Sequence, residues 1–304
     1  MKESPYLFHF GVKYAAYKLF NKRSPFFGSA DIINVCNLHC SHCYWWLNRK
    51  ENDELTVEQW KEVIETKFKK NHIFNITLVG GEPTLRPDII ELFVKEFPKR
   101  VCIVTNGTYP LQKYNDLYFY WVSIDGTKEA HDSIRGKGTY ASIRKNILDY
   151  LENNGEEAWK DIWISMTINS LNYKTVGDVA KEWYGHVNKI AFQFHTPFTK
   201  GDPLWVPFGP ERTKLVDEMI VMKDRYNGYI INPKPQLELM KRNWGGEGTT
   251  PIDCPTWAIL SVDHLGREKK PCCIGSSDKD SMKPICEDCG LACYSVFLSH
   301  GIKG

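Results

Sequence analysis

Cys36-Asn37-Leu38-His39-Cys40-Ser41-His42-Cys43 is the stretch of this sequence that decides the fold. It places three cysteines at the spacing C-x3-C-x2-C, directly after an apolar run, 30–35, that is typical of a β-strand. Three thiolates on one short loop can hold three irons of a 4Fe–4S cube and leave the fourth iron open to a small molecule. The alternative is a structural zinc ion with His39 or His42 as its fourth ligand.

A second motif strengthens the iron–sulfur interpretation. The run 73–79 is strand-like and ends in Gly80-Gly81-Glu82-Pro83, where the glycines would let backbone carbonyls approach a ligand. In combination, the two motifs resemble the radical S-adenosylmethionine (radical SAM) superfamily, and the resemblance covers residues 30–193. The resemblance implies that Cys36, Cys40 and Cys43 hold the cluster. It also implies that the turn formed by Gly80, Gly81, Glu82 and Pro83 binds the amino group of SAM.

Composition limits the class of protein. The chain has 304 residues, 42% of them hydrophobic, which is enough for one large domain with or without a small appendage. The net charge of +2 gives no reason to expect a nucleic acid as a partner. The ten cysteines are clustered, which points to metal in a reducing compartment. Without a secretion signal or a run of membrane-spanning length, the sequence predicts a cytoplasmic, soluble protein.

Strand and helix patterns alternate along the chain. Apolar or β-branched runs occur at 30–35, 73–79, 100–105, 118–124, 161–168 and 188–194. Helical patterns cover 56–70, 87–97, 138–152, 173–184, 210–225 and a shorter stretch near 235–243. Repeated strand–helix units predict a parallel sheet with helices outside it, an α/β fold. The resemblance implies a partial (β/α)6 barrel of the TIM type, with its chemistry at the C-terminal ends of the strands.

Three parts are expected. They are an N-terminal amphipathic segment (1–29), the barrel (30–245) and a small cysteine-rich domain (246–304). In the first part, 8–23 can form a basic helix with its apolar side chains on one broad side. We expect this helix to pack on the open side or the bottom of the barrel. The alternative is peripheral contact with an anionic membrane surface.

Other residues are candidates for the SAM site. Short polar residues end the third and fourth strands, where Asp125 can accept hydrogen bonds from ribose hydroxyls. The stretch 131–136 resembles the HDxxRG motif of family members with an auxiliary-cluster domain, which implies that Arg135 pairs with the SAM carboxylate. The resemblance also implies aromatic and hydrophobic contacts with the adenine. The remaining candidates are Tyr44, Asn106, Ser123, Ile168 and Asn169. Simple packing, turn formation, helix capping and ion pairing are the alternatives for these positions.

Two residues at the end of the sixth strand are candidates for catalysis. Gln193 and His195 would both point into the mouth of the barrel if the strand persists, since side chains alternate along a strand. His195 is a candidate substrate contact or proton acceptor, although a histidine that closes a strand is more often structural.

Six further cysteines lie near the C-terminus: Cys254, Cys272, Cys273, Cys286, Cys289 and Cys293. The run 257–262, a turn at 264–266 and a return strand predict a β-hairpin with a cysteine near each end. The pattern resembles the SPASM and shorter twitch extensions of radical SAM enzymes, which bind auxiliary 4Fe–4S clusters, but it has fewer cysteines than a full SPASM domain. We expect one auxiliary cluster, with Cys272 and Cys273 competing for one position. A zinc ribbon is the alternative. Cys102, within a strand, is expected to be a buried apolar residue.

The resemblance implies an enzyme that reductively cleaves SAM to a 5′-deoxyadenosyl radical, which abstracts hydrogen from an unactivated C–H bond. An electron donor such as ferredoxin or flavodoxin would be its partner. The substrate is open between a hydrophobic, lipid or prenyl-type molecule and a peptide or protein. The first alternative depends on the N-terminal segment and on the aromatic residues Trp205, Phe208 and Trp244. A non-catalytic iron–sulfur or zinc protein is the third alternative.

Overall fold

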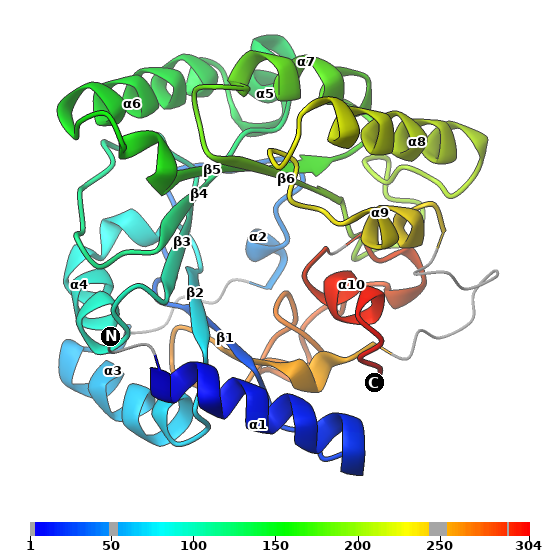
Figure 1. Cartoon of the computed structure of the whole chain (residues 1–304). Helices are drawn as coiled ribbons and strands as arrows, with labels where there is room; N and C mark the ends of the chain where they lie inside the picture. The colour runs from blue at the N-terminus through cyan, green and yellow to red at the C-terminus, as the bar shows by residue number, and fades with distance from the viewer. Residues whose placement is uncertain (1–3, 49–53, 243–253, 291) are drawn as a thin grey trace.

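One parallel β-sheet forms the centre of the protein. The computed structural model describes residues 4–48, 54–242, 254–290 and 292–304. The strands are β1 (Phe27–Asp31), β2 (Asn75–Val79), β3 (Val101–Thr105), β4 (Phe119–Ser123), β5 (Ile162–Ile168), β6 (Lys189–Phe194) and β7 (Ile259–Val262). Their order is β6-β5-β4-β3-β2-β1-β7, and every neighbouring pair is parallel. Figure 1 shows the sheet curled into a partial barrel with helices around its outside, as predicted.

The predicted alternation of strands and helices is confirmed. The α-helices are α1 (Ser4–Phe20), α2 (Trp45–Asn48), α3 (Val57–Val63), α4 (Pro87–Glu96), α5 (Lys128–Arg135), α6 (Thr139–Asn153), α7 (Val176–Trp183), α8 (Pro210–Arg225), α9 (Lys234–Met240) and α10 (Ala292–Ser299). A π-helix, η1 (Ile64–Lys69), continues α3, and the 3-10 turns are η2 (Pro83–Leu85), η3 (Ala158–Asp161), η4 (Tyr173–Thr175), η6 (Thr256–Ala258) and η7 (Cys286–Asp288). The sequence did not predict α5 or α10, because eight residues show barely two turns of a hydrophobic period.

The two faces of the sheet differ, and this difference makes room for a site inside the barrel. In β5 the residues that face the helices are fully buried: Ile162, Ile164, Met166 and Ile168. The residues between them face the interior of the barrel and stay partly exposed: Trp163, Ser165 and Thr167. The strand β6 repeats this alternation. The apolar core therefore lies between sheet and helices, and the interior face is free to carry polar side chains.

The C-terminal segment forms the predicted β-hairpin only in a short form. Its apolar run is β7, which pairs in parallel with β1 and so becomes an edge strand of the main sheet. The predicted turn is present, because the Asp263 carboxylate accepts hydrogen bonds from the amides of Leu265 and Arg267. Beyond the turn the chain forms only isolated antiparallel bridges. The Lys269 amide donates to the Ser261 carbonyl at 2.9 Å, and an antiparallel bridge joins Val262 to Glu268, so the hairpin prediction is confirmed in part.

Helix α10 stands on the side where the two edge strands do not meet. It packs on α9 and contacts β6. Its Phe297 meets Phe26 and Phe27 beside β1, with ring centroids 6.5 and 5.6 Å away. Figure 1 shows α9 and α10 on this open side of the barrel. The C-terminal segment is therefore attached to both edges of the sheet. The predicted domain boundary near residue 245 lies outside the described residues.

Helix α1 packs under the N-terminal ends of β1 and β2. The Phe10 ring lies 5.3 Å from each of the rings of Phe26 and Phe74, and Tyr17 lies 5.0 Å from Trp257. The expected packing on the bottom of the barrel is confirmed. The expectation that all apolar side chains of this helix share one side is wrong, since four of the predicted set are exposed: Val12, Tyr14, Leu19 and Phe20.

The chain leaves β1 along the turn formed by Gly80 and Gly81. β1 ends at Asp31, before the predicted end of the strand, because the following backbone crosses this turn. The Gly81 amide donates to the Ile33 carbonyl at 3.0 Å, and the next amide donates to the Val35 carbonyl at 2.8 Å. A Cβ atom on Gly81 would lie 2.0 Å from the Val35 oxygen. The glycines therefore accommodate the backbone that leads to the cysteines, a role that the sequence did not predict.

We expect Gly81→Ala to lower the free energy of unfolding by about 3 kcal/mol, the upper range for overpacking, because the methyl group would meet a backbone oxygen that cannot rotate away. Denaturant unfolding followed by circular dichroism measures this change, and thiol labelling reports whether the cysteine loop has moved. Gly177→Ala in α7 is the matched control, because its nearest neighbour would be the Met222 sulfur at an ordinary 3.7 Å. Unchanged stability and labelling of Gly81→Ala would contradict this explanation.

Candidate active site

A cavity of about 210 Å³ lies between the cysteine loop and the C-terminal ends of the strands. All three cysteines of the loop line it. Of the other residues predicted from the sequence, it is lined by Tyr44, Gly80, Gly81, Asn106, Ser123, Arg135, Gln193 and His195. It is not lined by Glu82, Pro83, Asp125, Ile168 or Asn169. The strand ends therefore bring most of the predicted residues together at one place.

The cysteine loop presents its thiols to this cavity and is tied to the barrel at both ends. The Ser41 amide donates to the Ile134 carbonyl of α5 at 2.9 Å. Nδ2 of Asn106 lies 3.9 Å from the Cys36 sulfur. Burial raises the pKa of the Cys40 thiol to about 11, and the Arg135 guanidinium opposes this shift. The pKa of each neighbouring cysteine is raised for the same reason, so metal binding must displace these protons.

The histidines of the loop are not arranged as zinc ligands. The His39 ring stacks on Trp46 with ring centroids 4.6 Å apart. Nε2 of His42 lies 3.3 Å from the Asp125 carboxylate. In the described part of the chain, no three histidine, cysteine or acidic side chains converge as they would around one metal ion. Three thiols on one loop, without a fourth protein ligand beside them, fit a cluster with one open iron.

Glu82 is buried and fully hydrogen-bonded, so its carboxylate is not free for the predicted contact with an ammonium. Its Oε1 accepts from the hydroxyls of Thr84 and Thr105, each at 2.7 Å, and its Oε2 accepts from the Asn106 amide at 2.8 Å. The carboxylate thus ties the turn after β2 to the end of β3. Pro83 is buried as well and begins η2. The carbonyls of Glu82 and Pro83 accept the amides of Leu85 and Arg86, so the carbonyls of Gly80 and Gly81 are the candidates of this turn for a ligand.

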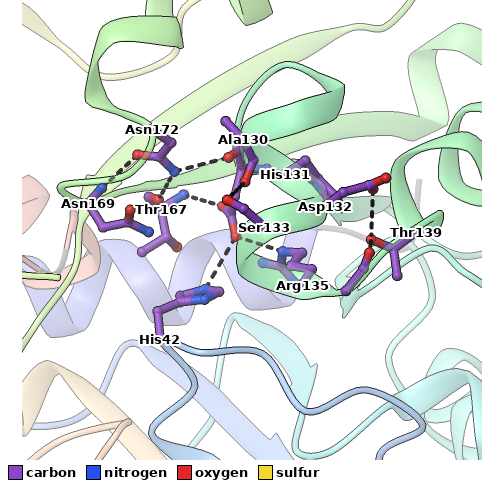
Figure 2. Close-up of polar contacts among 12 residues, drawn as sticks. His42, Ala130, His131, Asp132, Ser133, Arg135, Thr139, Thr167, Asn169 and Asn172 are labelled. Carbon is purple, nitrogen blue, oxygen red and sulfur yellow. Dashed lines mark hydrogen bonds and ion pairs between the residues drawn. The ribbon is translucent and has the colours of Figure 1, made fainter.

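Asp125 is the centre of a buried network after β4. Its carboxylate accepts from Nε of Arg135 at 2.6 Å and from the Thr167 amide at 2.8 Å, with His42 on a third side. Figure 2 shows His42, Arg135 and Thr167 converging on this point. Burial alone would raise the pKa of Asp125, but the Arg135 guanidinium and His42 hold it below its ordinary value. Asp125 is fully buried and orients Arg135, so its carboxylate does not face the cavity in which a contact with ribose hydroxyls was predicted.

His131 and Asp132 have structural roles. Nδ1 of His131 accepts the Asp125 amide at 3.0 Å. The Asp132 carboxylate accepts the amides of Gly138 and Tyr140 at 2.8 and 2.9 Å, at the start of α6. The polar stretch 131–136 therefore forms the end of α5 and the turn toward α6, and Arg135 is the residue of this stretch that reaches the cavity.

Ile168 and Asn169 lie away from the cavity. Ile168 belongs to the face of β5 that packs under the helices, and it does not line the cavity in which a contact with an adenine was predicted. Thr167, one residue earlier, lines the cavity instead. The Asn169 amide donates to Oδ1 of Asn172 at 2.7 Å in the turn that follows. Asn172 in turn donates to the carbonyls of Asp125 and Thr167, as Figure 2 shows. These asparagines fix the end of the strand.

Gln193 and His195 line the cavity at the C-terminal end of β6. Nε2 of His195 lies 2.9 Å from Oδ2 of Asp202. The His195 ring lies 6.4 Å from the ring of His42. Nε2 of Gln193 donates to the Thr167 hydroxyl at 3.1 Å. Asp202 was not predicted, because it lies in a loop without periodic pattern, and its only signal was a carboxylate shortly after a strand-ending histidine.

The C-terminal cysteines gather beside the same cavity. Tyr44, next to Cys43, stacks on Phe198 with ring centroids 5.8 Å apart. Around this pair lies a second hydrophobic cluster, and five cysteines pack against it: Cys254, Cys272, Cys273, Cys289 and Cys293. The sulfurs of Cys273 and Cys293 are 3.7 Å apart. Cys286 is exposed and is not part of this cluster. Tyr44 therefore lies between the two groups of cysteines as well as on the cavity wall.

Two contacts fix the C-terminal segment to the barrel mouth. The Gly290 amide donates to the Thr196 hydroxyl at 2.9 Å, directly after His195. Nζ of Lys269 donates to Asp31 at the end of β1 at 2.6 Å, and both side chains are almost completely buried. Burial raises the pKa of Asp31 to about 6 against the attraction of this ammonium. The cysteines of this segment are therefore held at a fixed place beside the cavity.

Comparison with known proteins identifies the family. The model of the radical SAM superfamily matches residues 31–181, which include the cysteine loop, the Gly80-Gly81 turn and β5. The chain belongs to the radical SAM superfamily. It is therefore an enzyme, and its cofactors are SAM and the 4Fe–4S cluster that its three-cysteine loop fits. The family by itself leaves the reaction open.

The similar proteins include maturases. Mycofactocin maturase MftC of Mycobacterium ulcerans is 26% identical over 209 residues, which are 64% of this chain and 55% of that protein. The sporulation killing factor maturation protein SkfB of Bacillus subtilis is 30% identical over 167 residues, 52% of this chain and 39% of that protein. This radical SAM enzyme thus spans about half, or less, of the length of these relatives.

The fold has a counterpart among solved structures. Streptococcus suis SuiB, in its complex with the precursor peptide SuiA, matches 96% of this radical SAM enzyme and 70% of the SuiB chain with a TM-score of 0.65. The sequence identity is 15%, so this likeness concerns the fold. It includes the C-terminal part of the chain, where the sequence resembles a SPASM or twitch extension.

We expect Asp125→Asn to destabilise the fold by about 3–5 kcal/mol, because it leaves the Arg135 guanidinium buried without its counter-charge. Denaturant unfolding of the protein measures the loss. Asp149→Asn is the matched control: its carboxylate pairs with Lys145 on the surface of α6, and such pairs contribute at most about 1 kcal/mol. Equal stabilities of the two variants would contradict the central role of Asp125.

Proposed function

We propose that this radical SAM enzyme modifies a peptide or protein substrate. The observation that carries the proposal is the cavity in which three cysteines face Arg135 and the His195–Asp202 pair. The names of MftC and SkfB describe maturation, and SuiB was solved with a precursor peptide. These are properties of those proteins, and they support the same substrate class here because the chain shares their family.

The side chains divide the work of binding. When bound and reduced, the cluster with SAM supplies a 5′-deoxyadenosyl radical that abstracts hydrogen from a C–H bond. Cys36, Cys40 and Cys43 would hold the cluster. Arg135, oriented by Asp125 from behind, offers its guanidinium to a carboxylate in the cavity, the predicted role toward SAM. The carbonyls of Gly80 and Gly81 are placed for an ammonium. Small side chains such as Ser123 leave the space open.

His195 is our candidate for the proton acceptor. An ionised carboxylate only accepts hydrogen bonds, so the Nε2–H group of a neutral His195 ring donates to Asp202. The lone pair of the ring then lies on Nδ1. His195 lines the cavity, where a substrate that has lost hydrogen would also give up a proton. Asp202 positions the ring. Gln193 is beside it and is our candidate for a substrate contact.

We assign one auxiliary 4Fe–4S cluster to the C-terminal cysteines. Cys254, Cys289 and Cys293 would each supply one ligand, and Cys272 or Cys273 the fourth. Arg212 supports an anionic group here. Its guanidinium is buried, no carboxylate forms an ion pair with it among the described residues, and Cys289 and Asp288 are the groups that favour its charged form. Burial lowers the pKa of Arg212 to about 9, and a thiolate-bound cluster would compensate its charge.

The lipid or prenyl-type substrate has lost its support. Helix α1, on which it depended, lies at the opposite end of the strands from the cavity. Trp205 and Phe208 pack on each other with ring centroids 5.7 Å apart, and Phe208 also covers Arg212. Trp244 lies outside the described residues. A peptide is therefore the substrate class that we propose, with a ferredoxin or flavodoxin as electron donor.

Iron analysis after anaerobic reconstitution tests the cofactors. We expect about eight irons per chain and formation of 5′-deoxyadenosine with dithionite and SAM. Cys293→Ser should retain about four irons and still cleave SAM. Cys286→Ser is the matched control and should keep all of its iron. Cys286 is exposed and does not pack with the other five C-terminal cysteines. Zinc in place of iron at the C-terminal cysteines would assign this segment a structural role. Absence of SAM cleavage would overturn the proposed function.

Incubation with short peptides encoded beside the gene tests the substrate class. We expect one of them to stimulate 5′-deoxyadenosine formation and to change in mass. His195→Ala should retain its iron and cleave SAM without converting the peptide, because it lacks the proton acceptor. Asp202→Asn should lower the rate of peptide conversion less than His195→Ala does, since it removes only the group that orients the His195 ring. Conversion of a lipid extract, with no response to any peptide, would contradict the proposal.

A further inference from the structure

Helix α1 is apolar on two sides, and the protein covers only one of them. Phe10 and Tyr17 face the barrel. On the opposite side, Phe8, Val12 and Leu19 are 67%, 49% and 73% exposed. These three residues lie at spacings of four and seven, so they form one line along the helix. A Cβ atom on Gly11 would find no neighbour within 4 Å, which confirms that this side is open.

The ends of the helix extend this surface. Leu7 is 53% exposed and Phe20 is 79% exposed. A helix that is apolar all round is ordinarily buried, and a contiguous exposed apolar patch marks an interaction site. No helix in the described ranges has the length and apolar character to cross a membrane. The surface is therefore one for docking.

The charges beside this face are positive. From residue 4 to residue 30 the sequence has no aspartate or glutamate. Lys18, Lys22 and Arg23 are exposed at the C-terminal end of α1. An apolar helix face flanked by cations matches the surface of a bilayer that contains anionic lipids, where apolar side chains enter the acyl boundary and cations meet the headgroups.

We propose that α1 docks this enzyme on an anionic bilayer surface. The position of the helix separates this contact from the chemistry. The His9 ring stacks on His72, just before β2, with ring centroids 4.2 Å apart. This is the N-terminal end of the strands, as Figure 1 shows for α1 beneath β1, whereas the cavity lies at their C-terminal ends. An electron donor or a substrate must reach the cavity, so neither explains this face.

A vesicle flotation assay with the reconstituted full chain tests the proposal. We expect binding to vesicles that contain phosphatidylglycerol, little binding to pure phosphatidylcholine, and weakening by salt. The double variant Phe8→Glu/Leu19→Glu should bind more weakly by about tenfold or more, because both apolar side chains leave the contact. Lys22→Glu should weaken binding by a similar factor. Iron content and SAM cleavage of these variants should remain those of the wild type.

Val221→Glu is the matched control. Val221 is 60% exposed on α8, so Val221→Glu adds one carboxylate at an isolated apolar position and should leave vesicle binding unchanged. Absence of binding to anionic vesicles by the wild type would overturn the proposal. So would a dimer in solution that the double variant dissociates, since a second copy would then cover the face. Loss of SAM cleavage with retained vesicle binding would contradict the proposed function and leave the docking surface in place.

Discussion

The structure depends on a backbone contact between the segment after β1 and the turn after β2. The carbonyls of Ile33 and Val35 accept hydrogen bonds from amides of that turn. A side chain in place of Gly81 would overlap the Val35 carbonyl. This contact fixes where the three thiols stand relative to the sheet. The next residue, Glu82, carries the constraint to β3 by binding Thr105 and the Asn106 amide. The position of the cysteines is therefore determined by hydrogen bonds of the sheet itself.

Charge has a comparable part in holding the cavity. Asp125 is buried, yet it remains a carboxylate because Arg135 and His42 face it. It joins the cysteine loop, α5 and β5 without touching the cavity. On the opposite side, Lys269 and Asp31 attach the C-terminal segment to β1. The cavity thus lies between two buried ion pairs, one behind each group of cysteines, and rigid walls of this kind suit chemistry that must exclude water.

Much of this arrangement could be predicted from the sequence. The six predicted strands of the barrel, most helices and the cysteine loop follow from local pattern and motif spacing, although β1 begins three residues and ends four residues before its predicted run. What failed depends on partners far along the chain. The pairing of β7 with β1, the engagement of Glu82 and the burial of Asp125 are set by residues that no local period connects to them. Ile168 shows a second limit, because a shift of one residue exchanges the two faces of a strand. His195 was predicted, but Asp202 was not, because loop geometry brings them together.

The pairing of the first and last strands bears on the order in which the protein is made. β1 is hydrogen-bonded to β2 on one side and to β7 on the other, and Lys269 is 238 residues from Asp31. During synthesis from the N-terminus, β1 keeps an unpaired edge until almost the entire chain has left the ribosome. Contacts of such sequence separation form late and slowly. The nascent enzyme therefore exposes its cysteine loop while the sheet is unfinished. Its thiols are most open to unwanted reaction before the chain is released from the ribosome.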